Sequence, residues 1–145
     1  TMMMTFMNQK EKQEEIIAEF SFFDDWMDKY AYIIDLGKEL NLIDEKDKKE
    51  ENLIKGCQSR VWLIVEKDAD GKLNFKADSD AIITKGIIAL LIRVVNGEKP
   101  ETLAKEELYF VDKIGLREHL SPTRSNGLLS MIRQMKYYAI ALSGK

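Results

Sequence analysis

The chain is poor in the residues that build disulfides and metal sites: its 145 residues include one cysteine and one histidine. The single cysteine, Cys57, cannot form a disulfide within the chain. Together with the histidine, His119, it supplies too few soft ligands for a zinc or iron–sulfur site, so we predict no metal site. Any chemistry at Cys57 therefore uses the thiol alone, or the thiol together with a partner protein.

Long apolar runs and an excess of positive charge are also absent. The longest nearly apolar segment, Ala81–Val95, is interrupted by Lys85, Gly86 and Arg93 and is too short to span a bilayer. The chain has 22 Lys and Arg against 25 Asp and Glu, so it lacks the basic footprint of a nucleic-acid binder. We expect neither a membrane nor a nucleic acid as a partner. Residues 1–7 show no signal-peptide cleavage pattern, and the expected location is the cytoplasm.

What the chain does contain is typical of one folded domain. Hydrophobic residues make up 45% and charged residues 32%, a balance that argues against a disordered or fibrous chain. A chain of 16.8 kDa is long enough to bury one real core. We therefore expect a single domain that spans residues 1–145.

The first half of the chain predicts two helices and a charged segment. Apolar residues at helical spacing favour a helix over Gln9–Phe20. Ser21-Phe22-Phe23-Asp24 resembles a capping box and predicts a second helix that runs to about Leu40. Asp44–Glu51 contains eight consecutive charged residues of mixed sign, which predict a solvated loop or a short helix.

The middle of the chain predicts a β-hairpin followed by a buried helix. Ser59–Lys67 contains a β-rich apolar run, Asp68–Gly71 is a turn signal, and Lys72–Ala77 alternates polar and apolar residues. Asp78-Ser79-Asp80 offers three helix N-cap candidates before Ala81–Val95, which is apolar almost all round. Asn96-Gly97 then predicts the end of that helix.

The last part predicts further helices. Pro100 is suited to the first position of a short helix, and another is expected around Glu106–Lys113, broken at Gly115. Ser121-Pro122 predicts the capped start of the C-terminal helix. Helices, one hairpin and then helices indicate an α+β fold, in which helices pack on a small antiparallel β-sheet.

Cys57 has polar neighbours, and these bear on its reactivity. Gly56 directly before it predicts a turn with a permissive backbone, which places the thiol on a loop. The cations Lys55 and Arg60 favour the thiolate, as expected of an accessible and reactive cysteine. The alternative is a buried structural cysteine, since free cysteine is among the most buried residue types.

Three other residues have both a structural and a functional interpretation. His119 is either a structural or solvent-facing loop residue near the Ser121 cap or the base of a thiol-dependent enzyme. Arg124 lies in the first turn of the last helix, where the helix dipole disfavours a cation, so it either braces the fold or serves an ion pair or an anion. Asp80 is most simply a helix cap.

Three separated blocks of the chain resemble the SufE family, the Fe–S metabolism-associated domain that includes its relative CsdE. The first is Asn52–Trp62, which holds the cysteine; the others are Ala77–Ala81 with Lys85-Gly86, and His119–Leu128. The N-terminal residues Phe23–Trp26, Tyr30 and Leu36-Gly37 also resemble the family's first helices. The blocks occur in the family's order, and the similarity extends over nearly the whole chain.

The resemblance implies a sulfur acceptor rather than a stand-alone enzyme. Family members receive sulfane sulfur from a PLP-dependent cysteine desulfurase of the SufS or CsdA type and raise its turnover. They hold the sulfur as a persulfide on the cysteine that matches Cys57 and pass it to an iron–sulfur scaffold complex. The PLP belongs to the partner, so no cofactor is expected in this chain. The implied fold is α+β and similar to the IscU scaffold.

The resemblance and the local context together nominate a set of site residues. Cys57 is the acceptor, and the resemblance implies Asp80 and Arg124 as groups near the partner. Two other functions stay open: a thiol-dependent enzyme that uses Cys57 with His119, and an interaction module with an incidental cysteine. Homodimer formation is also left open. The predicted site comprises Cys57, the supporting residues Lys55, Gly56, Gln58, Ser59 and Arg124, and the partner-binding residues Asp80 and Arg60.

Overall fold

The computed structural model describes residues 8–40 and 42–144. Residues 1–7, on which the expectation about a signal peptide rests, lie outside the described part. In chain order the elements are α2 (Gln9–Phe20), α3 (Trp26–Lys38), η1 (Glu45–Asp47), η2 (Glu50–Asn52), β1 (Val61–Lys67), β2 (Leu73–Ser79), α4 (Ile82–Val95), α5 (Pro100–Lys105), α6 (Phe110–Lys113), η3 (Arg117–His119) and α7 (Pro122–Leu142).

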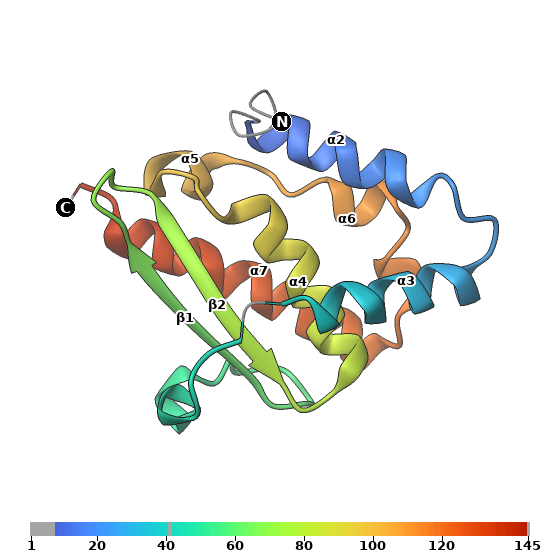
Figure 1. The fold of residues 1–145 in the computed structure, drawn as a ribbon, viewed down its shortest axis with the longest axis horizontal. Helices are drawn as coiled ribbons and strands as arrows, with labels where there is room; N and C mark the ends of the chain where they lie inside the picture. Colours follow the sequence, from blue (N-terminus) through green and yellow to red (C-terminus); the bar gives the residue numbers. More distant parts are fainter. Residues whose placement is uncertain (1–7, 41, 145) are drawn as a thin grey trace.

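The two strands form an antiparallel hairpin, in register from Val61 opposite Ser79 to Lys67 opposite Leu73. Figure 1 shows the hairpin along one side of the molecule, with α4 and α7 beside it and α2, α3 and α6 farther from the strands. This arrangement confirms the predicted α+β fold with helices packed on a small antiparallel sheet.

The apolar segment expected to be buried is the centre of the molecule. Ten of the 14 residues of α4 are buried, and α4 packs on β2, α3 and α7. Helix α3 crosses α4 with its backbone in close contact. A Cβ atom at Gly86 would lie 2.2 Å from the carbonyl oxygen of Ile33, and one at Gly37 would lie 2.8 Å from the amide nitrogen of Gly86. Only glycine at these two positions allows so close an approach.

The start of α3 was predicted at the capping box Ser21–Asp24, and this prediction was wrong. Ser21 is the C-cap of α2: its amide donates to the carbonyl of Ile17 and its hydroxyl donates to that of Ala18. Helix α3 begins instead at Trp26, where the side chain of Asp25 accepts a hydrogen bond from the amide of Asp28 at 2.9 Å. Because Ser21 ends α2, it cannot also cap the start of α3.

The predicted caps of α4 were also wrong. Its N-cap is Ala81, which makes no side-chain cap bond. Because β2 continues through Ser79, Asp78 and Ser79 are strand residues and Asp80 lies at the strand exit. Each of the three polar side chains is bonded to another part of the chain.

The other helix boundaries mostly follow the sequence signals. Gly97 has a φ of +83° directly after α4, and the amide group of Asn96 bonds to both backbone groups of Phe75. The hydroxyl of Ser121 accepts from the amide of Arg124 at 3.3 Å, which confirms the cap of α7. The helix expected around Glu106–Lys113 is shorter, since α6 begins at Phe110.

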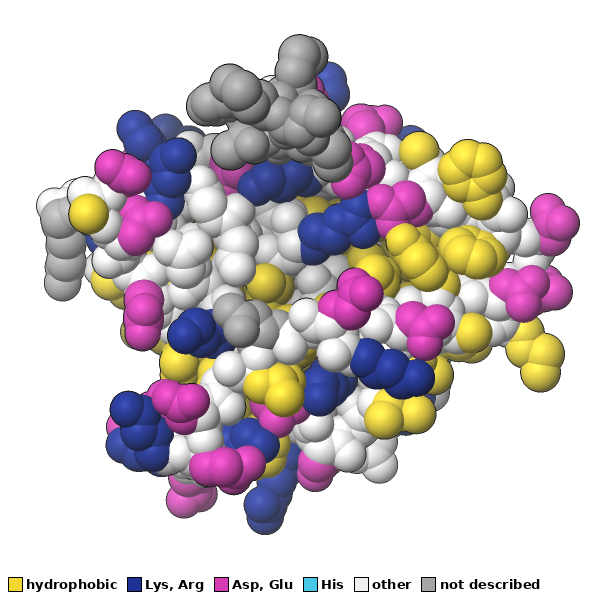
Figure 2. Space-filling model, in the orientation of Figure 1, with side chains coloured by type: hydrophobic (Ala, Val, Ile, Leu, Met, Phe, Trp, Pro, Cys, Tyr) yellow, Lys and Arg dark blue, Asp and Glu magenta, His cyan; other side chains and the backbone are white. Residues whose placement is uncertain are grey.

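The surface mixes charges of both signs. Figure 2 shows Lys and Arg side chains interspersed with Asp and Glu at the lower left, where Figure 1 places the chain of η1 and η2. In this exposed segment the charged run Asp44–Glu51 forms two short 3-10 turns, of which the second ends at Asn52. No helix in the described part of the chain is long and apolar enough to cross a membrane.

Candidate functional site

Cys57 lies in a loop, Lys55–Arg60, immediately before β1. The loop is closed at its base because the amide of Ile54 donates to the carbonyl of Val61 at 2.8 Å, and Leu53 forms an isolated bridge with Trp62. The residues between these two contacts carry no regular secondary structure. The sulfur is therefore carried by a short loop with a fixed base.

Gly56 sets the path of this loop across α7. Its φ is +90°, in the left-handed region that favours glycine, and a Cβ atom there would lie 2.5 Å from the Oγ of Ser130. Both the backbone angle and the contact therefore require a residue without a side chain. The glycine that the sequence marked as a permissive turn also brings the loop against the helix.

The thiol of Cys57 faces the backbone of α7. Its Sγ donates to the carbonyl oxygen of Gly127 at 3.6 Å, and a Cβ atom at Gly127 would lie 3.5 Å from that sulfur. The residue is half-buried, and burial raises the pKa of the thiol above its ordinary value. The predicted cation-favoured thiolate is wrong for this conformation: the local environment favours the neutral thiol.

A small pocket surrounds the sulfur. The volume that the centre of a water-sized sphere can reach is about 10 Å³, close to the minimum that holds one water molecule. The pocket is lined by Cys57–Ser59 of the loop, Thr84 and Ile87 of α4, and Thr123, Arg124, Gly127 and Met131 of α7. Four of the predicted site residues therefore meet here, namely Cys57, Gln58, Ser59 and Arg124.

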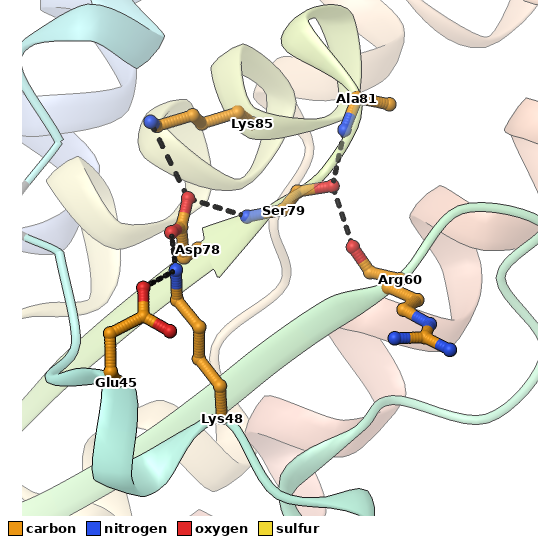
Figure 3. Close-up of polar contacts among 7 residues, drawn as sticks. All are labelled: Glu45, Lys48, Arg60, Asp78, Ser79, Ala81 and Lys85. Carbon is orange, nitrogen blue, oxygen red and sulfur yellow. Dashed lines mark hydrogen bonds and ion pairs between the residues drawn. The ribbon is translucent and has the colours of Figure 1, made fainter.

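The far end of the loop is tied to the exit of β2. Asp80 accepts a hydrogen bond from the amide of Arg60 at 3.0 Å. The hydroxyl of Ser79 donates to the carbonyl of Arg60 at 2.8 Å and accepts from the amide of Ala81 at 3.2 Å (Figure 3). The two residues predicted to bind a partner, Asp80 and Arg60, are thus bonded to each other, through a side chain and a backbone amide.

Asp78 anchors the charged segment beside the same site. Its carboxylate pairs with Lys48 at 2.8 Å and with Lys85 at 3.4 Å, and Lys48 also pairs with Glu45 at 2.8 Å (Figure 3). Burial raises the pKa of Asp78, but the bonds from Lys48 and the Ser79 amide and the two ammonium charges outweigh it, so the pKa is lowered. The contacts with Asp78 and Glu45 raise the pKa of Lys48 to about 12.

The role of Lys48 could not have been found from the sequence pattern. It lies within a run of eight charged residues, and nothing in the run distinguishes it from Lys46 or Lys49. Its ammonium also lies 5.5 Å from the centre of the Trp62 ring, a favourable cation–π distance. The partner that selects it, Asp78, is on a strand of the hairpin, so the signal is tertiary.

His119 is engaged elsewhere. Its ring stacks on Trp26 with centroids 4.1 Å apart, and its Nδ1 lies 2.9 Å from the carbonyl of Gly115. The hydroxyl of Tyr30 donates to its backbone carbonyl. His119 is not among the residues that line the pocket of Cys57. These contacts favour a structural role for His119 and give no support to a catalytic pair of Cys57 and His119.

Residues 8–40 and 42–144 contain no group of three or more His, Cys, Asp or Glu side chains arranged to hold a metal ion. The polar groups around Cys57 are a thiol, hydroxyls, an amide and a guanidinium. Such groups can protect a thiol, bond to a small sulfur species, or contact an acidic partner.

Comparison with known proteins gives consistent matches over most of the chain. The family model of the SufE, Fe-S metabolism associated, domain matches residues 14–139. An uncharacterised SufE-like protein of Rhizobium meliloti is 40% identical over 127 residues, which cover 85% of this chain and 91% of the relative. A second, from Rhizobium etli, is 39% identical over 127 residues, 85% of this chain and 86% of the relative.

A solved structure has a similar overall fold. The solution structure of a hypothetical protein from Thermus thermophilus superimposes with a TM-score of 0.76 and covers 92% of this chain and 97% of its own. At 17% sequence identity this likeness concerns the fold alone.

Proposed function

This chain belongs to the SufE family of Fe–S metabolism associated domains, and on that basis we propose that it is a sulfur acceptor in iron–sulfur cluster assembly. In this proposal it takes sulfane sulfur from a PLP-dependent cysteine desulfurase, holds it as a persulfide on Cys57, and passes it to a scaffold complex. The observation that carries the proposal is the position of the chain's one thiol, on a short loop over a pocket.

The transfer is a thiol–persulfide exchange that balances without an added oxidant or reductant. The Cys57 thiol first loses its proton, and the thiolate attacks the terminal sulfur of the donor's persulfide. A new S–S bond forms at Cys57 as the donor's S–S bond breaks, and the donor's thiolate leaves and can take up the proton. The second transfer repeats the step, with the Cys57 persulfide as donor and the scaffold as acceptor.

The resting conformation is suited to protection of the sulfur. A neutral thiol that donates to the carbonyl of Gly127 is a poor nucleophile, because the thiolate is the reactive form. The narrow pocket admits about one water-sized group, which limits access by oxidants and reductants. For the transfer, the loop must therefore bring Cys57 out of the pocket toward the donor.

The contacts of the loop allow such a movement without loss of the fold. Its base is held by the backbone bond between Ile54 and Val61, whereas the sulfur is held by one weak bond at 3.6 Å. Release of the sulfur from Gly127 breaks this bond and the packing of Cys57 against the core, while the backbone bonds of the hairpin remain. Lys55, Gly56, Gln58 and Ser59 would move with the thiol.

Arg124 and Asp80 are proposed to act at the partner interface. Arg124 is exposed at the pocket rim, and Asp80 is exposed while it holds the amide of Arg60. Charge reversal at Asp80 would therefore disturb the loop as well as the interface, and its effect on the desulfurase should be larger than that of an isolated surface charge.

The test combines turnover with mass. The purified chain and its Cys57→Ser variant are each incubated with free cysteine and a cysteine desulfurase encoded in the same genome. We expect the wild type to stimulate turnover and to gain roughly 32 Da, the mass of one sulfur atom, on the Cys57 peptide. A wild-type chain that neither gains sulfur nor raises turnover would overturn the proposal. An acyl adduct in place of the sulfur would point to a thiol-dependent enzyme instead.

A further inference from the structure

A second hollow lies on the other side of the Cys57 loop. It is formed by Lys55 and by one face of α7, with a volume of about 330 Å³. The α7 residues are spaced at i, i+3, i+4 and i+7, so they share one side of the helix. They are Ser130, Arg133, Gln134 and Tyr137.

The loop contributes residues both to this hollow and to the pocket around the sulfur. Gly56 rests on Ser130, which lines the hollow, and the next residue, Cys57, contacts Gly127, which lines the pocket. Lys55 belongs to the loop itself. A group bound in the hollow therefore lies one residue away from the backbone that positions the thiol.

The hollow is positively charged in a chain of net negative charge. Its lining includes two cations and no acid, whereas the whole chain has a net charge of −3. Within residues 8–40 and 42–144, neither Lys55 nor Arg133 makes an ion pair with an acid of the chain. Two cations without an acidic partner thus converge beside the loop.

We propose that this hollow binds a carboxylate side chain of the sulfur-donating partner, clamped between Lys55 and Arg133; this rests on the proposed function. The guanidinium of Arg133 is suited to a bidentate bond with a carboxylate, and the ammonium of Lys55 adds a second charge. Gln134 and Ser130 also line the hollow and offer further donors. Tyr137, with 64% of its surface exposed, supplies an apolar ring at the rim of the type that interfaces favour.

The location of the clamp gives it a role beyond attachment. Lys55 is adjacent to Gly56, whose backbone lies on α7, so a partner carboxylate that pulls on Lys55 acts on the segment that holds the thiol against Gly127. Docking and release of the thiol are thereby coupled through one loop. The partner is recognised by its acidic surface.

The experiment measures desulfurase turnover against the concentration of four proteins: wild type, Arg133→Glu, Arg133→Lys and the control Lys10→Glu. Lys10 is exposed on α2, and its reversal changes the net charge as much as Arg133→Glu does. We expect Arg133→Glu to raise the half-maximal concentration about fivefold, an effect of the size usual for a rim charge. Arg133→Lys should recover only part of the loss, because it restores the charge but not the bidentate geometry, and Lys10→Glu should match the wild type.

The outcomes separate this inference from the proposed function. If the wild type gives no stimulation, the proposed function fails, and the clamp fails with it. If the wild type stimulates but Arg133→Glu and Lys10→Glu give the same curve, only the clamp is overturned. Sodium glutamate supplies a second test: it should raise the half-maximal concentration of the wild type at an ionic strength where sodium chloride does not, because a free carboxylate competes with the partner for the hollow. An equal effect of sodium glutamate on the wild type and on Arg133→Glu would overturn the clamp.

Discussion

The Asp68 turn and the Cys57 loop lie at opposite ends of the hairpin and depend on different kinds of contact. At the turn, Asp68 accepts hydrogen bonds from the amides of Asp70 at 3.0 Å and Lys72 at 2.9 Å and from the side chain of Asn74 at 3.2 Å. The Asp68 amide also donates to the carbonyl of Lys72 at 2.8 Å. Every partner of Asp68 lies within six residues, so this turn is determined locally, although Leu73 at the start of β2 also bonds to Glu98 and Gly97.

The Cys57 loop at the other end depends on distant residues. Its thiol bonds to Gly127, 70 positions away, and the amide of Arg60 bonds to Asp80, 20 positions away. A local turn cannot change without loss of its own hydrogen bonds, whereas a loop held by tertiary contacts can be released one contact at a time. We expect from this difference that the Asp68 turn stays rigid and that the Cys57 loop moves in the proposed transfer.

The largest expected effect comes from removal of the sulfur itself. Cys57→Ser should abolish persulfide formation and desulfurase stimulation, because a hydroxyl cannot attack a persulfide sulfur as a thiolate does. Its hydroxyl can still donate to Gly127, so the free energy of unfolding should change by less than about 1 kcal/mol. Turnover assays and urea unfolding check the two halves. Retained stimulation would mean that Cys57 is incidental.

The next largest effect is a loss of stability when the glycine at each end of the hairpin is replaced by alanine. Gly71→Ala meets only the positive φ of +80°, since the nearest atom, the Cε of Lys67, would lie 3.8 Å from the new methyl group. Gly56→Ala meets a φ of +90° and also the Oγ of Ser130 at 2.5 Å. We expect about 1–2 kcal/mol of lost stability at Gly71, and about 1–3 kcal/mol more at Gly56 unless the loop lifts away.

A double variant isolates the contact. Without the hydroxyl of Ser130, the nearest side-chain atom would be its Cβ at 3.4 Å, an ordinary contact distance. The variant Gly56→Ala/Ser130→Ala should therefore recover most of the excess loss and resemble Gly71→Ala in urea unfolding. Equal losses in Gly56→Ala and Gly71→Ala, with no rescue, would show that α7 does not press on the loop.

The contrast between the two ends also explains what could be predicted from the sequence. The turn Asp68–Gly71 and the exit at Asn96-Gly97 were predictable, because their determinants are adjacent in the chain. The loop around Cys57 was predictable from Gly56 for the same reason. The buried helix followed from an apolar run that no exposed element could accommodate.

The errors lie where distant contacts decide. The cations Lys55 and Arg60 flank Cys57 in sequence, yet burial against α7 determines the state of the thiol. Asp78 was expected to cap α4, but the ammonium groups of Lys48 and Lys85 select it as an ion-pair partner. Burial and ion pairs between separated residues carry no local signal, so these parts of the site required the structure.

A smaller effect is expected when one aspartate at each end is neutralised. Asp78→Asn removes two ion pairs from a side chain that is 9% exposed, and we expect a loss of about 1–3 kcal/mol at neutral pH. The pKa of Asp78 is lowered in the folded chain, so its contribution is present above about pH 4 and is lost as the pH falls through the folded value.

The fall in unfolding free energy between neutral and acid pH, the acid limb, therefore tests the ion pairs of Asp78. In Asp78→Asn, urea unfolding followed from pH 6 down to about pH 2 should show a weaker loss of stability than in the wild type. Asp68→Asn is the matched change at the turn, where backbone amides give the main contribution that lowers the pKa. Its effect on the acid limb should be smaller, because Asp68 is exposed. Parallel acid limbs in the wild type and Asp78→Asn would contradict the role of this pair.

The smallest effect concerns Arg124 and separates tuning of the thiol from docking. Arg124 is exposed at the rim of the pocket, where solvent screens its charge, and burial is the cause of the raised pKa of Cys57. In Arg124→Ala, the midpoint of Cys57 alkylation against pH should therefore move by less than about half a unit, or about 0.7 kcal/mol. Gly56→Ala, if it lifts the loop from α7, should instead lower that midpoint toward the ordinary value, because the thiol becomes solvated.

Sulfur transfer from the desulfurase should still be slower in Arg124→Ala at an unchanged melting temperature, since the loss is then one of docking. A midpoint that rises by a full unit in Arg124→Ala would show instead that the guanidinium stabilises the thiolate, and the movement of the loop would no longer be needed to activate it.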